Sequence, residues 1–346
     1  MNPPTKRPTI SDLAKAAGVS VATIDRLLNG RHPVREETAR RIFEAATEIG
    51  FHGANAIRQR TLAQQPDYHL GFILQKERHA FYQEFAARIE EVVRSHPDRR
   101  LRATIRFVQS TSPTELAELI RGMKGKVRAV AVTGIDHHDA TAAVAELKAA
   151  GIPTFSLLSD FAQGVREGYI GTNNLKAGRT AAWLMSKIAR GPGRIAVFIG
   201  AFRYHGHALR ETGFRSYFRE FAPEFTLTDS IVNVETRQLT YEATLGLLDR
   251  HDDVVGIYVA GGGMEGAIAA LREVRRPDEV TCIVHELTPE SRQGLLDRHV
   301  SVVMATPLPA LCTDLIEMMV HSIEHGMAEN PGQRFLPAQL WTPESL

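Results

Sequence analysis

At 346 residues the chain is too long for one ordinary domain. Its net charge of +1 is unevenly distributed. Residues 1–65 carry 10 Lys and Arg against 6 Asp and Glu, so this segment has a net charge of +4 and the remainder has −3. Its two cysteines, Cys282 and Cys312, are too few for a disulfide framework and predict core residues of a reduced, cytoplasmic protein. No apolar run reaches the roughly 20 residues that span a bilayer, and MNPPTKRPT lacks the apolar core of an export signal, so a membrane or exported protein is not expected.

Residues 9–29 predict two short helices joined by a tight turn. Thr9 can cap the first helix and Ser20 can cap the second, which is expected over about 21–28. Apolar residues at steps of three and four give each helix one buried side. A helix-turn-helix places its second helix in the DNA major groove, so Arg26 on the outer side becomes the first candidate for a base contact. The alternative is a small helical domain in which Arg26 is merely solvated.

A third helix is expected over about 36–49, with a buried stripe of apolar residues and Gly50 as its stop. Together these segments resemble the DNA-binding headpiece of the LacI/GalR family of bacterial transcription regulators over roughly the first 60 residues. The motifs that carry the likeness are AxxAGVS, TxxR, the following Asn-Gly, and a third helix that ends in Gly and an aromatic residue. The resemblance implies DNA contacts at Thr9, Ser20, Val21, Ala22, Thr23, Arg26 and Asn29. Asp25 departs from the Ser usual in the family, which leaves operator preference open.

Residues 53–67 stand where the family has a hinge helix that folds on DNA and pushes a Leu into the minor groove. Gly53 replaces the usual Pro, and a Gly start is expected to loosen the free hinge. The spacing leaves two candidates for the wedge, Ile57 and Leu62. A basic linker without groove contact is the alternative.

From Tyr68 short apolar strands alternate with amphipathic helices, which is typical of parallel sheets with helices on both faces. The helices are expected near 80–95, 113–124, 139–150 and 309–325. The strands are expected at 70–75, 101–108, 129–135, 152–158, 194–201, 227–234, 255–262, 281–287 and 300–306. This many strands fit two lobes better than one sheet, and ligands bind at the carboxyl ends of such strands.

This part resembles the periplasmic sugar-binding-protein fold, from about residue 69 nearly to the end. The predicted fold class is therefore α/β, with an N-terminal all-α helix-turn-helix domain followed by a two-lobed, doubly wound, periplasmic-binding-protein-like domain. The predicted domains are a headpiece at 1–52, a hinge at 53–67, and an effector-binding and dimerisation domain at 68–346. The predicted lobes are about 68–170 with about 288–308, and about 171–287 with about 309–346.

Three motifs of this resemblance imply an effector site. HAFYQEF looks like an aromatic pair that stacks on a sugar, HALRETGF matches the family's effector-binding Arg, and IVHEL has a Glu where the family has an Asp that binds hydroxyls. A sugar has apolar faces and a rim of hydroxyls, which aromatic and polar side chains suit. With polar residues from other loops, the implied site comprises His79, Phe81, Tyr82, Asp136, Asn173, Arg210 and Glu286.

Each effector residue has an alternative, since the aromatics are also consistent with core packing, Arg210 with a surface ion pair, and the loop Asp136 and Asn173 with ordinary turn chemistry. Gly261 and Ala305 stand where ligand-binding Asn and Gln are common in the family. These two departures point to an effector different from that of the best-known relatives.

Other chemistry has little support. GGGMEG (261–266) lacks the Lys-Ser/Thr of a phosphate loop, and no GxSxG motif is present. His137 and His138 lie between two Asp residues, but adjacent residues rarely converge on a metal, so neither a metal nor a cofactor is expected.

The sequence thus predicts a non-enzymatic, homodimeric repressor of a carbohydrate catabolism or uptake operon, associated with the bacterial nucleoid. Its expected partners are double-stranded operator DNA and a sugar-like small-molecule effector, with no membrane. A solute-binding receptor of a sugar transporter and a sugar-acting α/β enzyme are the rival classes.

Overall fold

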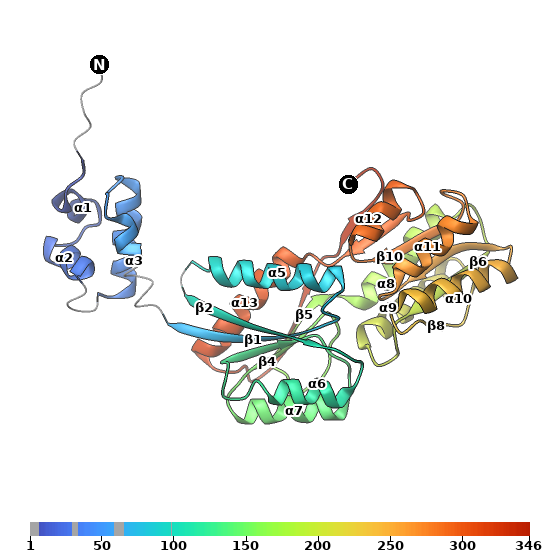
Figure 1. Cartoon of the computed structure of the whole chain (residues 1–346), viewed down its shortest axis with the longest axis horizontal. Helices are drawn as coiled ribbons and strands as arrows, with labels where there is room; N and C mark the ends of the chain where they lie inside the picture. Colours follow the sequence, from blue (N-terminus) through green and yellow to red (C-terminus); the bar gives the residue numbers. More distant parts are fainter. Residues whose placement is uncertain (1–6, 30–33, 59–65, 98) are drawn as a thin grey trace, which may run out of the picture. The chain divides into compact units, whose positions relative to one another are not determined.

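The structure is a computed structural model that describes residues 7–29, 34–58, 66–97 and 99–346. They form two compact units (Figure 1), of which the smaller lies within 1–68 and 93–102, and the larger comprises 69–92 and 103–346. Within the described ranges, none of the helices has the length and apolar character needed to traverse a bilayer.

The three helices of the smaller unit begin and end close to the predicted positions, at α1 (Ile10–Ala16), α2 (Val21–Asn29) and α3 (Glu36–Glu48). Thr9 and Asp12 cap α1 reciprocally: the Thr9 N–H donates to Asp12 Oδ2 at 2.9 Å, and the Asp12 N–H donates to Thr9 Oγ1 at 3.3 Å. The small core consists of apolar side chains from all three helices, together with Phe51.

The predicted hinge begins as a helix over 54–58. Ile57, one of the two wedge candidates, is completely buried in the headpiece core, so its side chain stabilises that core and is not free to enter a DNA groove. This corrects the expectation for Ile57. The other candidate, Leu62, lies outside the described residues.

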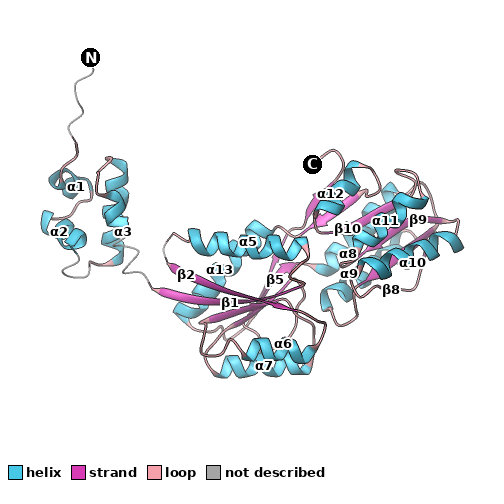
Figure 2. Ribbon diagram, viewed as in Figure 1, coloured by secondary structure: helices cyan, strands magenta, loops and turns pink. Residues whose placement is uncertain are grey.

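The larger unit has two sheets, which define two lobes (Figure 2). Lobe 1 is built on a six-stranded sheet of order β12-β5-β4-β3-β1-β2. Helices α5 and α13 cover one face of this sheet, and α6 and α7 cover the other (Figure 1). Its elements are β1 (Asp67–Gln75), α5 (Ala80–Ser95), β2 (Arg100–Val108), α6 (Pro113–Arg121), β3 (Ala129–Val132), α7 (His138–Ala149), β4 (Thr154–Leu157), β5 (Gly168–Thr172), α13 (Leu308–His325) and β12 (Gly332–Leu336).

Lobe 2 is built on a seven-stranded sheet of order β13-β11-β10-β9-β6-β7, with β8 also paired to β6. Its pairs are parallel except for β11 with β13. Its elements are α8 (Asn174–Ile188), β6 (Arg194–Ile199), α9 (His205–Phe221), β7 (Thr226–Leu227), β8 (Ile231–Val232), α10 (Arg237–Arg250), β9 (Val254–Val259), α11 (Met264–Val274), β10 (Thr281–His285), α12 (Pro289–Leu296), β11 (Val302–Ala305) and β13 (Gln339–Trp341).

The assignment of the last third of the chain to lobes is a correction. The sequence assigns 288–308 to lobe 1 and 309–346 to lobe 2, but β11 pairs in parallel with β10 and so stays in lobe 2 with α12. The physical reason is that a strand–helix–strand unit returns to its own sheet. Helix α13 instead packs on β3 and β5 of lobe 1, and the chain returns to lobe 2 only at β13.

The strand predicted at 227–234 is interrupted. Two parts of this segment form the two-residue strands β7 and β8. Asn233 follows β8, and Val234 and Glu235 after it have φ of +49° and +51°. Strands β5, β12 and β13 were not predicted, because they are short and rich in glycine or polar residues.

Helices α8 and α9 pack at very short backbone distance, which two glycines permit. A Cβ atom on Gly178 would overlap the backbone carbonyl of Arg210, and one on Gly213 would overlap that of Leu175. Gly246 in α10 differs, because only one side-chain atom of Arg250 lies within 4 Å of a Cβ there, at 3.9 Å.

We therefore expect Gly178→Ala to destabilise the larger unit by about 1–3 kcal/mol, since the two backbones must move apart. Gly246→Ala is the matched control and should stabilise it by about 0.5–1 kcal/mol, because alanine favours the helix. Both tryptophans, Trp183 and Trp341, lie in the larger unit, so urea unfolding followed by tryptophan fluorescence reports on this unit alone. Equal effects of the two substitutions would contradict the close-packing account.

Candidate functional site

The outer face of α2 is the first candidate site. Ile24 and Leu27 are buried, whereas Val21 is 50% exposed and Ala22 and Asn29 are exposed. Ser20 caps the helix, as predicted, because its Oγ accepts the Thr23 N–H at 3.2 Å.

Two side chains of this face are held along the helix. The Arg26 Nε–H donates to the Ala22 carbonyl at 3.2 Å, and the Arg26 guanidinium forms no ion pair with any carboxylate in the described ranges. The Asn29 amide donates to Asp25 Oδ1 at 2.6 Å. The carboxylate that departs from the family pattern therefore has a partner on its own helix, and the charge of Arg26 remains available to a ligand.

The second candidate site is a cleft between the two lobes of the larger unit, where a cavity of about 80 Å³ remains. It lies at the carboxyl ends of β1, β3 and β4 of lobe 1 and of β9 and β10 of lobe 2, as expected for parallel sheets. Five of the seven predicted effector residues line it, namely His79, Phe81, Tyr82, Arg210 and Glu286.

Asp136 and Asn173 do not line this cavity, which corrects two expectations. Asp136 is exposed to solvent beyond β3. Asn173 is the N-cap of α8, where its Oδ1 accepts the Lys176 N–H at 3.0 Å, and it borders a separate cavity of about 300 Å³. Both residues follow a strand, but solvent surrounds the first and helix capping engages the second.

Arg210 lies in the cleft as predicted, and its burial excludes a surface role. The side chain is 7% exposed, its Nε–H donates to Asn174 Oδ1 at 2.7 Å, and its Nη1–H donates to the Ala260 carbonyl at 2.9 Å. These two bonds hold the guanidinium while leaving it without a carboxylate partner within ion-pair distance among the described residues. A buried cation held in this way suits hydrogen-bond acceptors on a ligand.

Glu286 also borders the cavity but already has two partners. Its carboxylate accepts the Thr306 N–H at 2.9 Å and the Thr306 hydroxyl at 2.7 Å. Burial raises the pKa of Glu286, although these bonds and Arg210 oppose the shift.

The two aromatic residues Phe81 and Tyr82 differ in their surroundings. Phe81 is 6% exposed and packs against Phe85, so it forms part of the core as well as of the cavity wall. Tyr82 meets Phe81 edge-on, with ring centroids 5.1 Å apart. Burial raises the pKa of Tyr82, so its hydroxyl stays protonated and can donate a hydrogen bond into the cleft.

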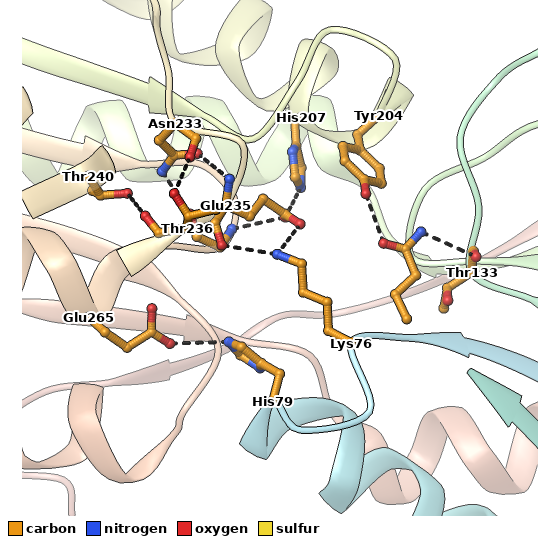
Figure 3. A network of polar contacts seen from close by, with 12 residues as sticks. Lys76, His79, Thr133, Tyr204, His207, Asn233, Glu235, Thr236, Thr240 and Glu265 are labelled. Carbon is orange, nitrogen blue, oxygen red and sulfur yellow. Dashed lines mark hydrogen bonds and ion pairs between the residues drawn. The ribbon is translucent and has the colours of Figure 1, made fainter. Parts of the chain in front are cut away.

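Several cleft residues were missed by sequence reasoning. Lys76, Tyr204, His207 and Glu235 line the cavity and belong to a network of polar contacts (Figure 3). The available signal for Lys76 was its position directly after the first strand. No motif marks Glu235, because it follows the strand that the structure breaks.

The Gly-rich run GGGMEG does contribute to the cleft, though not by binding phosphate. The Gly262 N–H donates to Glu235 Oε1 at 3.1 Å, and Gly263 at φ +90° starts α11. Gly261 faces His207: a Cβ on Gly261 would lie 2.5 Å from His207 Cε1. The imidazole therefore occupies the space that any side chain at position 261 would need.

Two titrating groups of the cleft have strongly shifted pKa values. Burial lowers the pKa of His207 to about 4, against the attraction of Glu235. Burial would raise the pKa of Glu235, but His207, Lys76 and the Gly262 N–H outweigh it and lower that pKa to about 2. Near neutral pH the cleft therefore holds a neutral imidazole beside an ionised carboxylate.

His137, His138 and Asp139 come closer together than the sequence predicts, because their potential ligand atoms lie within 4.8 Å of one another. His137 Nδ1, however, accepts the Asp139 N–H at 3.2 Å as the N-cap of α7. Helix capping thus accounts for the position of His137, while His138 Nε2 lies 3.1 Å from Asp139 Oδ1.

Two family models match the chain. Residues 70–326 match the periplasmic binding protein domain, and residues 9–53 match the bacterial regulatory proteins of the lacI family.

Three similar curated proteins are regulators. The HTH-type transcriptional regulator GntR of Pseudomonas aeruginosa is 30% identical over 212 residues, which are 61% of this chain and 58% of that protein. The ribitol operon repressor of Klebsiella aerogenes is 28% identical over 202 residues, 57% of this chain and 72% of that protein. The HTH-type transcriptional regulator DegA of Bacillus subtilis is 23% identical over 350 residues, 98% of this chain and 96% of that protein. The chain thus spans less than two thirds of the GntR regulator.

Similar solved structures include solute-binding proteins of transporters. One from Actinobacillus succinogenes with bound D-allose has a TM-score of 0.73 at 18% identity, covering 80% of this chain and 98% of that one. One from Bacillus halodurans with bound myo-inositol has a TM-score of 0.71 at 17% identity, covering 80% and 95%. At these identities the likeness shows the fold alone.

The lowered pKa of His207 predicts how the free energy of unfolding depends on pH. The pKa of His207 in the folded chain, about 4, lies below the ordinary histidine value of 6.5. The unfolded chain therefore binds a proton that the folded chain does not, and stability is lost as pH falls from 6.5 toward 4. The loss attributable to His207 is at most about 3 kcal/mol. His207→Gln should reduce the slope of unfolding free energy against pH, measured by tryptophan fluorescence. Exposed His325→Gln is the control, and a wild-type slope in His207→Gln would refute the assignment.

Proposed function

Since the chain belongs to the periplasmic binding protein domain family and carries the domain of the lacI family of bacterial regulatory proteins, we propose that it is a sugar-responsive, DNA-binding transcription repressor. It acts as a homodimer in the bacterial cytoplasm, on an operon for carbohydrate catabolism or uptake. The observation that carries this proposal is the joining, in one chain, of a helix face that exposes Arg26 to an interlobe cleft around Arg210.

The DNA end of the mechanism rests on α2. Two headpieces of a dimer read the two halves of a palindromic operator, with α2 in the major groove. Arg26 donates to a base edge, preferably guanine, while Thr9, Ser20, Thr23 and Asn29 hold phosphates.

The effector end rests on the cleft. A sugar stacks on Tyr82, and its hydroxyls meet Arg210 and Glu286. Because the ligand contacts both lobes, it favours one arrangement of them, and this shift of population alters how the two hinges meet the operator.

A thermal-shift screen of the purified chain against sugars, polyols and their phosphates tests the effector half. A ligand that binds only the folded state raises the melting temperature. Retardation of genomic DNA fragments in a gel tests the DNA half, and a chain that binds no segment better than random duplex overturns the proposal. Turnover of a sugar would instead favour an α/β enzyme, and sugar binding without DNA binding would favour a transport receptor.

We expect Arg26→Ala to weaken operator binding by about 10- to 100-fold, because a base-contacting Arg contributes about 1–3 kcal/mol of discrimination. The measurement is gel retardation with the strongest genomic fragment. Arg40→Ala is the matched control, since Arg40 is 60% exposed on α3 and its removal changes the net charge equally. Dimerisation, followed by sedimentation, should survive both changes. If both variants lost the same amount of DNA affinity, Arg26 would contribute only a nonspecific positive charge and the proposed base contact would be excluded.

We expect Arg210→Ala to abolish the thermal shift produced by the effector while DNA affinity without effector is retained. Loss of charge-assisted hydrogen bonds at about 1.5–3 kcal/mol corresponds to roughly 10- to 100-fold weaker effector binding. Arg215→Ala, on the same helix but bonded to Glu211 at 2.9 Å outside the cavity, is the control. An unaltered effector titration in a folded Arg210→Ala protein would exclude the proposed contact.

A further inference from the structure

Side chains from the end of β1 and from the turn to α5 contact lobe 2 through three polar pairs (Figure 3). Lys76 Nζ lies 2.8 Å from Glu235 Oε2, His79 Nε2 lies 3.1 Å from Glu265 Oε1, and the Tyr204 hydroxyl donates to Gln75 Oε1 at 2.8 Å. In each pair one partner belongs to lobe 1 and the other to lobe 2. These contacts hold the lobes together from inside the effector cleft.

Little space remains once these pairs have formed. The cavity of about 80 Å³ is well below the roughly 300–1,000 Å³ of ligand pockets. The space that a ligand would take is thus partly filled by side chains of the protein itself, and Lys76 is the longest of them to reach across.

In lobe 2, two oxygen atoms of Glu235 are placed to accept hydrogen bonds from the ammonium group of Lys76. Lys76 Nζ contacts the carboxylate of Glu235 and also donates to its backbone carbonyl at 3.0 Å. Both oxygens reach the same point because Val234 and Glu235 are in the left-handed region, which a β-branched residue such as valine rarely adopts. Backbone strain of this kind persists only where the surroundings enforce it, and it gathers at functional sites.

Asn233 enforces the strained turn from within lobe 2. It is 1% exposed, its Oδ1 accepts the Glu235 N–H at 2.9 Å, and its Nδ2 donates to the Gly262 carbonyl at 2.9 Å. Neither bond involves lobe 1. The two acceptors of Glu235 therefore remain in place when the lobes separate.

The two charges differ in how easily they can part. The Lys76 side chain is 29% exposed, whereas that of Glu235 is 11% exposed. When the pair opens, Lys76 can turn toward water. The buried carboxylate keeps the Gly262 N–H on Oε1 but loses the ammonium group on Oε2, and the loss of a partner destabilises a buried charge. The lobe 2 site consequently favours a cation or another strong donor.

We propose that Glu235 forms an ammonium-binding site in lobe 2, which Lys76 occupies as an internal ligand, so that the effector-free cleft closes on itself. Any effector must displace Lys76 and offer donors to Glu235 in its place. The second statement rests on the proposed function of the cleft, whereas the first concerns the free protein and needs neither DNA nor effector.

The test measures the distance between the lobes in the full chain. Spin labels are placed on Ala142→Cys in lobe 1 and Asp249→Cys in lobe 2, which are both exposed. Native Cys282 and Cys312 are buried, and burial raises the pKa of both thiols, which disfavours the thiolate that reacts with a label. Lys76→Met in this background should shift the distance distribution measured by pulsed electron paramagnetic resonance toward a longer, broader separation. Lys76→Gln serves as a second variant, and Lys124→Met, which removes an exposed lysine of lobe 1, should leave the distribution unchanged.

Chemical rescue then tests the site itself. Propylammonium chloride supplies the missing ammonium and should return the Lys76→Met distribution toward the closed one, whereas tetramethylammonium chloride at equal ionic strength should not, because it has no N–H to donate. Rescue should disappear in Lys76→Met with Glu235→Gln.

A wild-type distribution in both Lys76 variants, or rescue by both salts alike, would overturn the proposal. Neither result would contradict the proposed regulatory function. Conversely, a failure to bind DNA would not contradict the Lys76–Glu235 contact that closes the cleft.

Discussion

Charged side chains that follow strands of two facing sheets pair across the cleft, and the behaviour of the larger unit depends on this constraint. Lys76 at the end of β1 meets Glu235 of lobe 2, and His79 meets Glu265 at the start of α11. Burying a charge without a partner costs free energy, so the lobes can separate only if new partners replace the ones that are lost. A ligand that replaces the partners therefore acts on lobe geometry directly.

The path of the chain shows which segments connect the two lobes. The backbone passes between the lobes after β5, after β11 and after β12, so three neighbouring connections join two otherwise separate sheets. The sheet of lobe 2 has its own buried clusters, whereas the core cluster of lobe 1 also includes Tyr204 from the lobe 2 segment before α9. Such a unit is suited to hinge motion, in which a few connecting residues absorb the change.

The headpiece could be predicted in detail because its determinants are local. Helix caps at Thr9 and Ser20, the stop at Gly50 and apolar residues at steps of three and four act within one or two turns, and the structure confirms them. Ile57 shows where this local reasoning ends: its sequence context suits a groove wedge, but the packing of α1, α2 and α3 buries it. Whether a side chain lies inside or outside such a small core depends on the surface beside it.

By itself the sequence determined the helical headpiece, the alternation of strands and helices, and five residues that line the interlobe cleft, because periodicity, caps and motifs are properties of neighbouring residues. Only the tertiary structure decided that β11 and α13 lie in different lobes, that Asp136 and Asn173 face away, and that Lys76 reaches Glu235. The last pair is separated by 159 positions and forms because a broken strand places Glu235 in a left-handed turn opposite β1. Contacts between distant segments depend on how sheets face each other, which local sequence does not encode.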